Sequence, residues 1–125
     1  MQPVNLFALA SQQARWLSVR QTAVSSNVAN ANTPGYGAVD VEPFEAVLDN
    51  TRVAVRATHP KHIAIGATAD ALSVRQVNES SPTMPSGNSV VLEDELLKAG
   101  EVRRSLELNT AIVKAFHRML MMTTR

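Results

Sequence analysis

The sequence predicts a mainly α-helical chain, in which long N-terminal and C-terminal helices pack as an α-helical hairpin or coiled coil around a small, irregular β/loop insertion. Apolar residues recur at steps of three and four over residues 4–31 and again over 89–125, which is the spacing of one helical face. The residues between lack that period and end in a stretch rich in serine, proline and glycine. The chain therefore divides into an N-terminal helix (1–31), a middle region (32–88) and a C-terminal helix (89–125).

The composition favours a thin core and argues against several function classes. Of the 125 residues 45% are hydrophobic, but only Trp16, Tyr36 and three phenylalanines are aromatic, and aromatic side chains bury the most surface. Much of the apolar surface is therefore expected to be buried only on assembly. A formal net charge of +1, with both signs interspersed, predicts neither nucleic-acid binding nor membrane insertion. The lack of cysteine excludes disulfides, thiolate metal sites and cysteine nucleophiles.

The N-terminal helix carries one apolar seam. Its positions are Phe7, Ala10, Ala14, Leu17, Gln21, Val24 and Val28. Ala10 and Ala14 are small enough to let a partner helix approach closely. Gln21 interrupts the seam, either as a polar insert that fixes helix register at a cost in stability or as a residue tolerated at a partly wet position.

The N-terminal helix is predicted to end within residues 25–36. Asn32 suits the left-handed residue just past a helix C-terminus, and Pro34 pushes the residue before it out of helical geometry. Pro34 and Gly35 then form the central pair of a type II turn, because proline presets one dihedral angle and glycine accepts the positive one.

Asn27 and Asn30 share a face near this end, although asparagine is a poor residue for a helix interior. One interpretation is a frayed, solvent-facing last turn, which composition alone favours. The other is a polar ladder whose amides bond to neighbouring backbone and fix the register where this helix meets others.

The middle region is predicted to contain short elements only. Residues 36–41 are extended, and Pro43 lies in the first turn of a short helix that ends near Asn50. Linker composition predicts a mobile loop over 78–88. Partial alternation predicts a strand over 51–57, a turn at 59–62, and short strands at Ile63 to Ile65 and at Leu72 to Gln76.

The C-terminal helix is predicted to be capped by Asn88 or Ser89 and oriented by its charges. Glu93, Asp94 and Glu95 lie near its positive N-terminal end, and basic residues lie towards the other end. Its main apolar stripe comprises Leu92, Leu96, Ala99, Val102, Leu106, Val113, Phe116 and Leu120.

A second stripe makes the last turns of this helix apolar on more than one side. It comprises Leu108, Ile112, Ala115, Met119 and Met122. A helix that is apolar all round is normally buried in something larger. Subunits packed side by side would supply that burial; alternatively, the N-terminal helix covers one stripe and the middle region covers the other.

The sequence does not indicate catalytic or cofactor chemistry. His59 and His62 flank a proline turn, and no nearby carboxylate or thiolate completes the ligand set of a zinc site. The sequence has no glycine-rich phosphate loop, nucleophile elbow or His-Glu-x-x-His helix. We therefore expect no enzyme activity, no metal and no cofactor.

The run from Ser25 to Tyr36, SSNVANANTPGY, resembles the N-terminal signature of the flagellar basal-body rod, hook and hook-associated axial proteins. The segments THPKHI, from Thr58, and GNSVVLEDE, from Gly87, are further similar to the proximal-rod, B-type branch of that family. A basic residue often follows the Gly-Tyr pair in the family, whereas Gly37 and Ala38 follow it here. The residues on signature positions are Asn27, Ala29, Asn30, Thr33, Gly35 and Tyr36.

The resemblance implies a structural subunit of the proximal rod of the bacterial flagellar basal body, which assembles by helix packing into a torque-transmitting axial shaft. The implied partners are other rod and basal-body proteins, further copies of this chain, and the flagellar type III export apparatus. The implied location is periplasmic, reached without a cleaved signal peptide. Composition alone would make the chain cytoplasmic, because Met1–Ala10 lacks a signal peptide's basic start and apolar length. The rival interpretations are a soluble helical adaptor or chaperone-like binding module and a small metal-dependent enzyme.

If the chain is such a subunit, its surplus apolar surface and its signature residues form the contacts between subunits. Residues 32–41 would form an extended link that bridges adjacent subunits, and Asn27 and Asn30 would be fixed polar contacts at a subunit junction. The predicted interface residues are Leu17, Gln21, Val24, Asn27, Val28, Asn30, Asn32, Thr33, Gly35, Tyr36, Leu106, Val113, Phe116, Met119 and Leu120.

Overall fold

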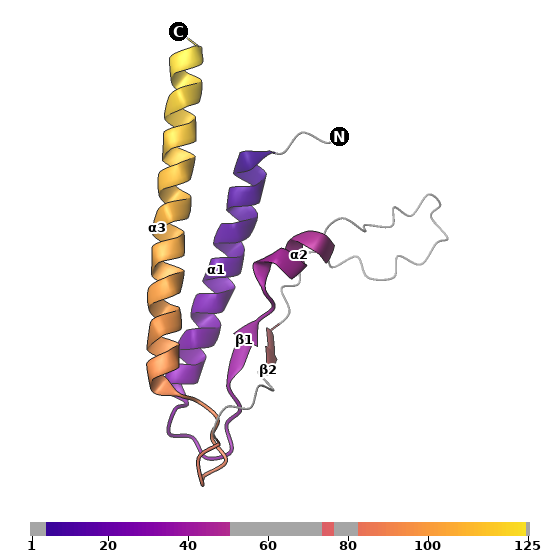
Figure 1. Cartoon of the computed structure of the whole chain (residues 1–125), viewed down its shortest axis with the longest axis vertical. Helices are drawn as coiled ribbons and strands as arrows, with labels where there is room; N and C mark the ends of the chain where they lie inside the picture. The colour runs from indigo at the N-terminus through magenta and orange to yellow at the C-terminus, as the bar shows by residue number, and fades with distance from the viewer. Residues whose placement is uncertain (1–4, 51–73, 77–82, 125) are drawn as a thin grey trace, which may run out of the picture.

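A computed structural model describes residues 5–50, 74–76 and 83–124 of the chain. The two long helices lie side by side and antiparallel, and α3 extends beyond the N-terminal end of α1 (Figure 1). The predicted mainly α-helical fold, with long terminal helices and a small, irregular strand and loop region between them, is confirmed. The elements in order are α1 (Leu6–Ala29), β1 (Val39–Val41), α2 (Phe44–Asn50), β2 (Val74–Gln76) and α3 (Leu92–Thr123).

The start of α1 is held both locally and from α3. The Oδ1 atom of Asn5 accepts hydrogen bonds from the backbone N–H groups of Phe7 (3.1 Å) and Ala8 (3.3 Å), which have no partner within the helix. The ring of Phe7 packs edge-on against Phe116 of α3, with 5.4 Å between the ring centroids. α1 therefore begins at a capped end that also contacts the C-terminal half of α3.

The C-terminal end of α1 contains no left-handed residue. The N–H group of Asn30, the residue after Ala29, donates to two carbonyl groups of the last helical turn. Among the described residues only Gly35 (φ 73°) and Gly87 (φ 80°) have a positive φ, so the left-handed conformation predicted for Asn32 is wrong. It is not needed, because the N–H groups of Asn30 and Ala31 bond to carbonyls of the last helical turn, and a side chain from just before α3 binds the carbonyls that follow it.

The proline–glycine turn that follows is as predicted. The N–H group of Tyr36 donates to the carbonyl of Thr33 at 3.3 Å, which closes the turn across Pro34 and Gly35. Gly35 carries the positive φ that the third residue of a type II turn requires.

A second turn, formed by residues 83–88, packs against the first. The N–H group of Gly35 donates to the carbonyl of Ser86 at 2.9 Å, and a Cβ atom on Gly87 would lie 3.4 Å from the Cα atom of Gly35. Composition predicts a mobile loop over 78–88, but the described part of that segment is this hydrogen-bonded turn. The chain therefore brings the end of α1 close to the start of α3.

β1 and β2 form a two-stranded antiparallel sheet in which Val39 pairs with Gln76 and Val41 pairs with Val74. α2 follows β1, and its first residue, Phe44, comes directly after the proline that predicts a short helix there. The strands predicted at 51–57 and 63–65, the turn with the two histidines, and Leu72 lie outside the described residues.

The core is small and lies where α1, α3 and β1 meet. The aromatic side chains of the described residues lie at its margins: the indole N–H of Trp16 donates to the carbonyl of Glu42 at 2.7 Å, and the Trp16 ring packs against Phe44. The core is therefore thin, as the aromatic content predicts. Its buried apolar residues are Ala10, Leu17, Ala23, Val24, Ala38, Val41, Val90 and Val102.

We predict opposite effects of two glycine-to-alanine substitutions. Gly87→Ala should lower the free energy of unfolding by about 1–2 kcal/mol, because alanine resists a positive φ. Gly100→Ala should raise it by about 1 kcal/mol, because Gly100 is inside α3 and an added Cβ there meets nothing within 4 Å. Urea unfolding followed by circular dichroism measures both. Equal effects of the two substitutions would contradict the turn geometry.

Candidate assembly site

Asn27 is fully buried where α1, β1 and α3 meet. Its Nδ2 atom donates to the carbonyl of Val39 (2.7 Å) and to Oε2 of Glu95 (3.0 Å). Its Oδ1 atom accepts from the N–H group of Val39 (3.0 Å) and the hydroxyl of Tyr36 (3.3 Å). The amide thus binds both backbone groups of Val39, as a neighbouring strand would, and also holds a side chain of α3. This is the polar ladder, not the frayed turn.

Asn30 plays a smaller, local part. Its Nδ2 atom donates to the carbonyl of Ser26 at 2.8 Å, and its Oδ1 atom accepts from the hydroxyl of Thr33 at 3.1 Å. These contacts connect the last turn of α1 to the first residues after it. Asn30 is only half-buried, so its side chain lies at the edge of the junction.

Glu95 connects Asn27 to a row of charged side chains. It is 2% exposed, and its Oε1 atom lies 2.9 Å from Nζ of Lys98. Nζ of Lys98 lies 3.5 Å from Oδ2 of Asp40, whose Oδ1 lies 3.4 Å from Nε of Arg20. A buried carboxylate requires such partners, because an unpaired charge in the interior is costly. The sequence pattern assigns Glu95 to helix polarity alone, but its side chain is buried and also connects α3 to α1.

The surroundings of Lys98 shift its proton affinity. Partial burial lowers the pKa of Lys98, but the hydrogen bond and the charge of Glu95, together with those of Asp40, outweigh burial. The net result is a pKa above the ordinary value of 10.5. The charged form of Lys98 is therefore part of the folded arrangement.

Asn88, which lies at the end of the middle region in the sequence, binds the backbone that follows the C-terminal end of α1. It is 1% exposed, and its Nδ2 atom lies 2.8–3.0 Å from the carbonyl oxygens of Asn30, Ala31 and Thr33. These carbonyls follow the last helical turn, and those of Asn30 and Thr33 also accept the backbone N–H groups of Thr33 and Tyr36. The Oδ1 atom of Asn88 accepts from the N–H group of Val90 at 2.8 Å.

The predicted cap of α3 is therefore wrong. Val91 occupies the cap position of α3, and no side chain bonds there. Asn88 is committed to α1, and the hydroxyl oxygen of Ser89 accepts from the N–H group of Ala38 at 2.9 Å. Both side chains connect the two halves of the chain and leave the start of α3 uncapped.

Asn109 is the fourth buried polar side chain among the residues that the structure describes, and it lies farther along α3. It is 8% exposed, and its Nδ2 atom donates to the carbonyl of Ala10 and to Oε1 of Gln13, both at 3.0 Å. With Glu95 and Val102 it forms a row at seven-residue spacing that Phe116 continues. A search for buried residues at that spacing, polar ones included, could have found this row.

Of the predicted main stripe of α3, only Val102 is buried. Leu96 is 59% exposed and Leu106 is 45% exposed, because the row through Glu95 and Asn109 faces α1 instead. The second stripe is also exposed: Leu108 by 60%, Met122 by 71%. α1 covers the main stripe at Val102 and in part at Val113 and Phe116, and neither α1 nor the described part of the middle region covers the second stripe.

The predicted interface residues divide by exposure. Leu17, Val24 and Asn27 are buried inside the subunit. Asn30, Tyr36, Val113 and Phe116 are partly exposed. The exposed ones are Gln21, Val28, Asn32, Thr33, Gly35, Leu106, Met119 and Leu120.

Residues 36–41 pack along their own α1. The backbone of Val39 bonds to Asn27 and that of Ala38 to Ser89, so this stretch, expected to bridge adjacent subunits, is tied into its own chain. The exposed residues 32–35 precede it and form the outer edge of the turn.

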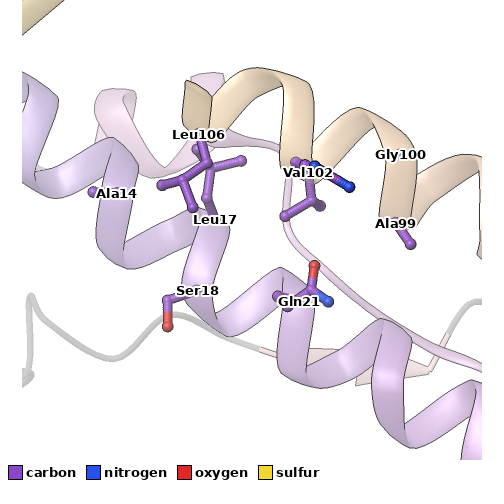
Figure 2. A pocket seen from close by; sticks show the side chains of 9 residues that line it. Ala14, Leu17, Ser18, Gln21, Ala99, Gly100, Val102 and Leu106 are labelled. Atoms are coloured by element: carbon purple, nitrogen blue, oxygen red, sulfur yellow. The ribbon is translucent and has the colours of Figure 1, made fainter. Parts of the chain in front are cut away.

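A groove of about 580 Å³ runs between α1 and α3. Figure 2 shows Leu17 and Leu106 next to one another between the two helices, with Ser18 and Gln21 further along α1. Gln21 is thus a wet position at the groove edge, with its side chain exposed. The groove is lined by Ala14, Leu17, Ser18 and Gln21 of α1 and by Ala99, Gly100, Val102, Arg103 and Leu106 of α3.

Two further features complete the description of the site. Within residues 5–50, 74–76 and 83–124, no three histidine or acidic side chains gather as metal ligands would. No helix in those ranges combines the length with the hydropathy needed to span a membrane.

Comparison with known proteins identifies relatives along the whole chain. Residues 8–36 match the family described as flagella basal body rod protein. The chain is 48% identical over 129 residues to the flagellar basal body rod protein FlgB of Agrobacterium fabrum, covering 100% of this chain and 96% of that protein. It is 32% identical over 99 residues to the FlgB protein of Aeromonas hydrophila, covering 76% of this chain and 72% of that protein.

We predict that Asn27→Ala lowers the free energy of unfolding by about 3 kcal/mol, because it leaves both backbone groups of Val39 and an oxygen of Glu95 buried without this partner. The matched control is Asn30→Ala, which removes half-buried local bonds and should cost about 1 kcal/mol or less. Urea unfolding provides the measurement. A control that costs as much as Asn27→Ala would refute the special position of Asn27.

We predict that Lys98 contributes to a loss of stability of the fold as the pH becomes alkaline. Its folded pKa is raised, so its contribution is fully present below the ordinary value of 10.5 and is lost as pH rises through the folded pKa. Lys98→Met should remove part of the fall in unfolding free energy between about pH 9 and about pH 12. The same change at the exposed Lys114 serves as control. Identical pH profiles for both variants would exclude the role of Lys98.

Proposed function

Since the chain belongs to the FlgB family of flagellar basal body rod proteins and is a structural subunit of that rod, we propose that it assembles by packing α1 and α3 against the helices of neighbouring subunits. The assembled subunits would form the proximal part of a torque-transmitting axial shaft. The family is structural, and its membership does not favour the alternative of a soluble adaptor or chaperone-like module.

One observation carries this proposal: the C-terminal half of α3 exposes an apolar surface that the described part of the subunit does not cover. Met119, Leu120, Met121 and Met122 are 56%, 41%, 58% and 71% exposed. Burying a leucine or methionine side chain contributes about 1.5–3 kcal/mol. A few such residues per subunit, repeated around a shaft, would outweigh the cost of ordering the helices.

The predicted interface residues would act in two ways. The exposed ones, such as Val28, Leu106 and Met119, would contact neighbouring subunits. The buried ones, such as Leu17 and Asn27, would hold α1, β1 and α3 in the arrangement that presents those contacts. The exposed turn at residues 32–35 would contribute a polar contact beside them.

The remaining partners also belong to this proposal. We expect self-association within the rod, contacts with the flagellar type III export apparatus on the way to it, and a periplasmic position in the assembled basal body. The thin core supports export, because a chain with little tertiary stability is readily kept unfolded for passage through a narrow channel.

Deleting the gene in its source bacterium should abolish swimming, and the full-length gene should restore it. A gene truncated after Phe116 should express the chain but fail to restore swimming or rods, because it removes the exposed methionine cluster. Immunoblots, motility plates and electron microscopy of basal bodies provide the measurements. Swimming by the deletion strain would refute the function, and normal rods with the truncated chain would refute the role of the cluster.

A further inference from the structure

We propose that the groove between α1 and α3 binds the C-terminal half of α3 from a second copy of this chain, displaced along the helix axis. The proposal rests on the self-association proposed above and names the two surfaces that meet. The groove supplies one surface, and the exposed stripe from Leu108 to Met122 supplies the other.

The groove has the shape to accept a helix. Four of its nine lining residues are small, namely Ala14 and Ser18 on α1 and Ala99 and Gly100 on α3. Gly100 is exposed, and a Cβ atom added to it would meet nothing within 4 Å, so the outer edge of the groove on α3 is open. Small residues let helix backbones approach closely, and an apolar groove between helices is a common seat for an amphipathic helix.

The stripe has the spacing of a helix that fits such a groove. Its residues recur at steps of four and three, the pattern of one seam of a coiled coil. Leu108, Ile112 and Met119 are 60%, 45% and 56% exposed. α3 passes the first turn of α1 at Phe116 and continues beyond α1 (Figure 1), so the end of the stripe projects from the subunit. Methionine side chains adapt to irregular surfaces.

The sequence of α3 repeats its apolar positions after 16 residues: Leu92, Leu96 and Ala99 correspond to Leu108, Ile112 and Ala115. At about 100° per residue, such positions face directions about 160° apart. The groove and the stripe therefore lie on nearly opposite sides of α3. A shift of one copy by about 24 Å along the axis, with little rotation, brings the stripe of that copy beside the groove of the next.

The charges along α3 favour this shifted, parallel contact. The first 16 residues of α3, 92–107, contain five acidic and three basic side chains. The next 16, 108–123, contain no acidic side chain, two basic ones and a histidine. The shift places the net-positive half of one α3 along the net-negative half of another. Of the basic side chains, Arg118 lies at the edge of the stripe, on the same flank of the contact as Glu107 of the neighbour, whereas Lys114 and His117 lie farther round the helix. The one charged side chain that lines the groove, Arg103, is 83% exposed and pairs with Glu107.

This contact joins two different surfaces, so each added copy offers a new groove and a new stripe. Such heterologous contacts form rings where the rotation closes and open filaments where it does not. A pairing of identical surfaces would stop at two copies. The contact is therefore of the kind from which a shaft can grow.

Crosslinking in isolated basal bodies tests the proposal. Because the chain has no cysteine, each introduced cysteine is the only one in its copy. Two differently tagged copies, one with Gly100→Cys and one with Met119→Cys, are produced together in the deletion strain and treated with a short bismaleimide. In the shifted contact Gly100 lies between Ala115 and Met119 of the neighbour. Thr110→Cys replaces Met119→Cys as the control, because Thr110 lies on the opposite side of α3 from the stripe.

We expect the yield of crosslinked dimer from the Gly100→Cys and Met119→Cys copies to exceed the yield from the Gly100→Cys and Thr110→Cys copies by about tenfold. Basal bodies that contain both copies in swimming cells but give no such excess would overturn this inference and leave the proposed function intact. A crosslink from Gly100→Cys to a different rod protein would also overturn it. Basal bodies that lack the chain altogether would instead refute the proposed function.

A second pair of variants tests the groove without crosslinking. Gly100→Trp places a bulky side chain at the open outer edge of the groove, where the neighbouring helix would have to approach, and Gly100→Ala adds only a methyl group there. We expect Gly100→Trp to abolish swimming and Gly100→Ala to preserve it, with both proteins present at normal levels in the cells. Swimming by the Gly100→Trp strain would overturn the inference.

Discussion

The buried amide of Asn27 is the interaction on which the rest of the structure depends. It binds both backbone groups of Val39 and a carboxylate oxygen of Glu95 while excluded from water. If α1 slid along β1 by one residue, each of these groups would lose its partner, at about 1–3 kcal/mol apiece. That loss is comparable with the whole stability of a small domain. The amide therefore fixes one register for the junction, and the orientation of both long helices follows from it.

The usual distribution of polar residues outside and apolar residues inside is partly reversed in this subunit. Buried positions hold Asn27, Asn88, Glu95 and Asn109, whereas leucines and methionines of α3 lie at the surface. Fully partnered polar groups add little net stability, but they permit only one arrangement. Apolar surface adds affinity without direction. The interior thus specifies the shape of the subunit, and the surface supplies the drive to associate.

Local patterns explain what could be predicted from the sequence. The period of three and four residues gave the two long helices, and Pro34 with Gly35 gave the turn, because each depends on residues near one another in the chain. The buried ties could not be found that way. Glu95 and Asn27 are 68 positions apart in the sequence, and a search for apolar periodicity ignores both residues because they are polar. Two segments that carry the family resemblance contain Asn27 and Glu95, but the resemblance does not show that the two side chains meet.

The contact of Asn88 with the end of α1 has a consequence for the order of folding. The helix end and the side chain that completes it are separated by 55 to 58 positions. Closing so long a loop costs entropy before the contact returns any enthalpy, so it forms late. An N-terminal segment emerging from any narrow passage would remain incomplete until the start of α3 had followed it. The subunit would then mature only after nearly all of its chain had arrived, and premature association along the way would be disfavoured.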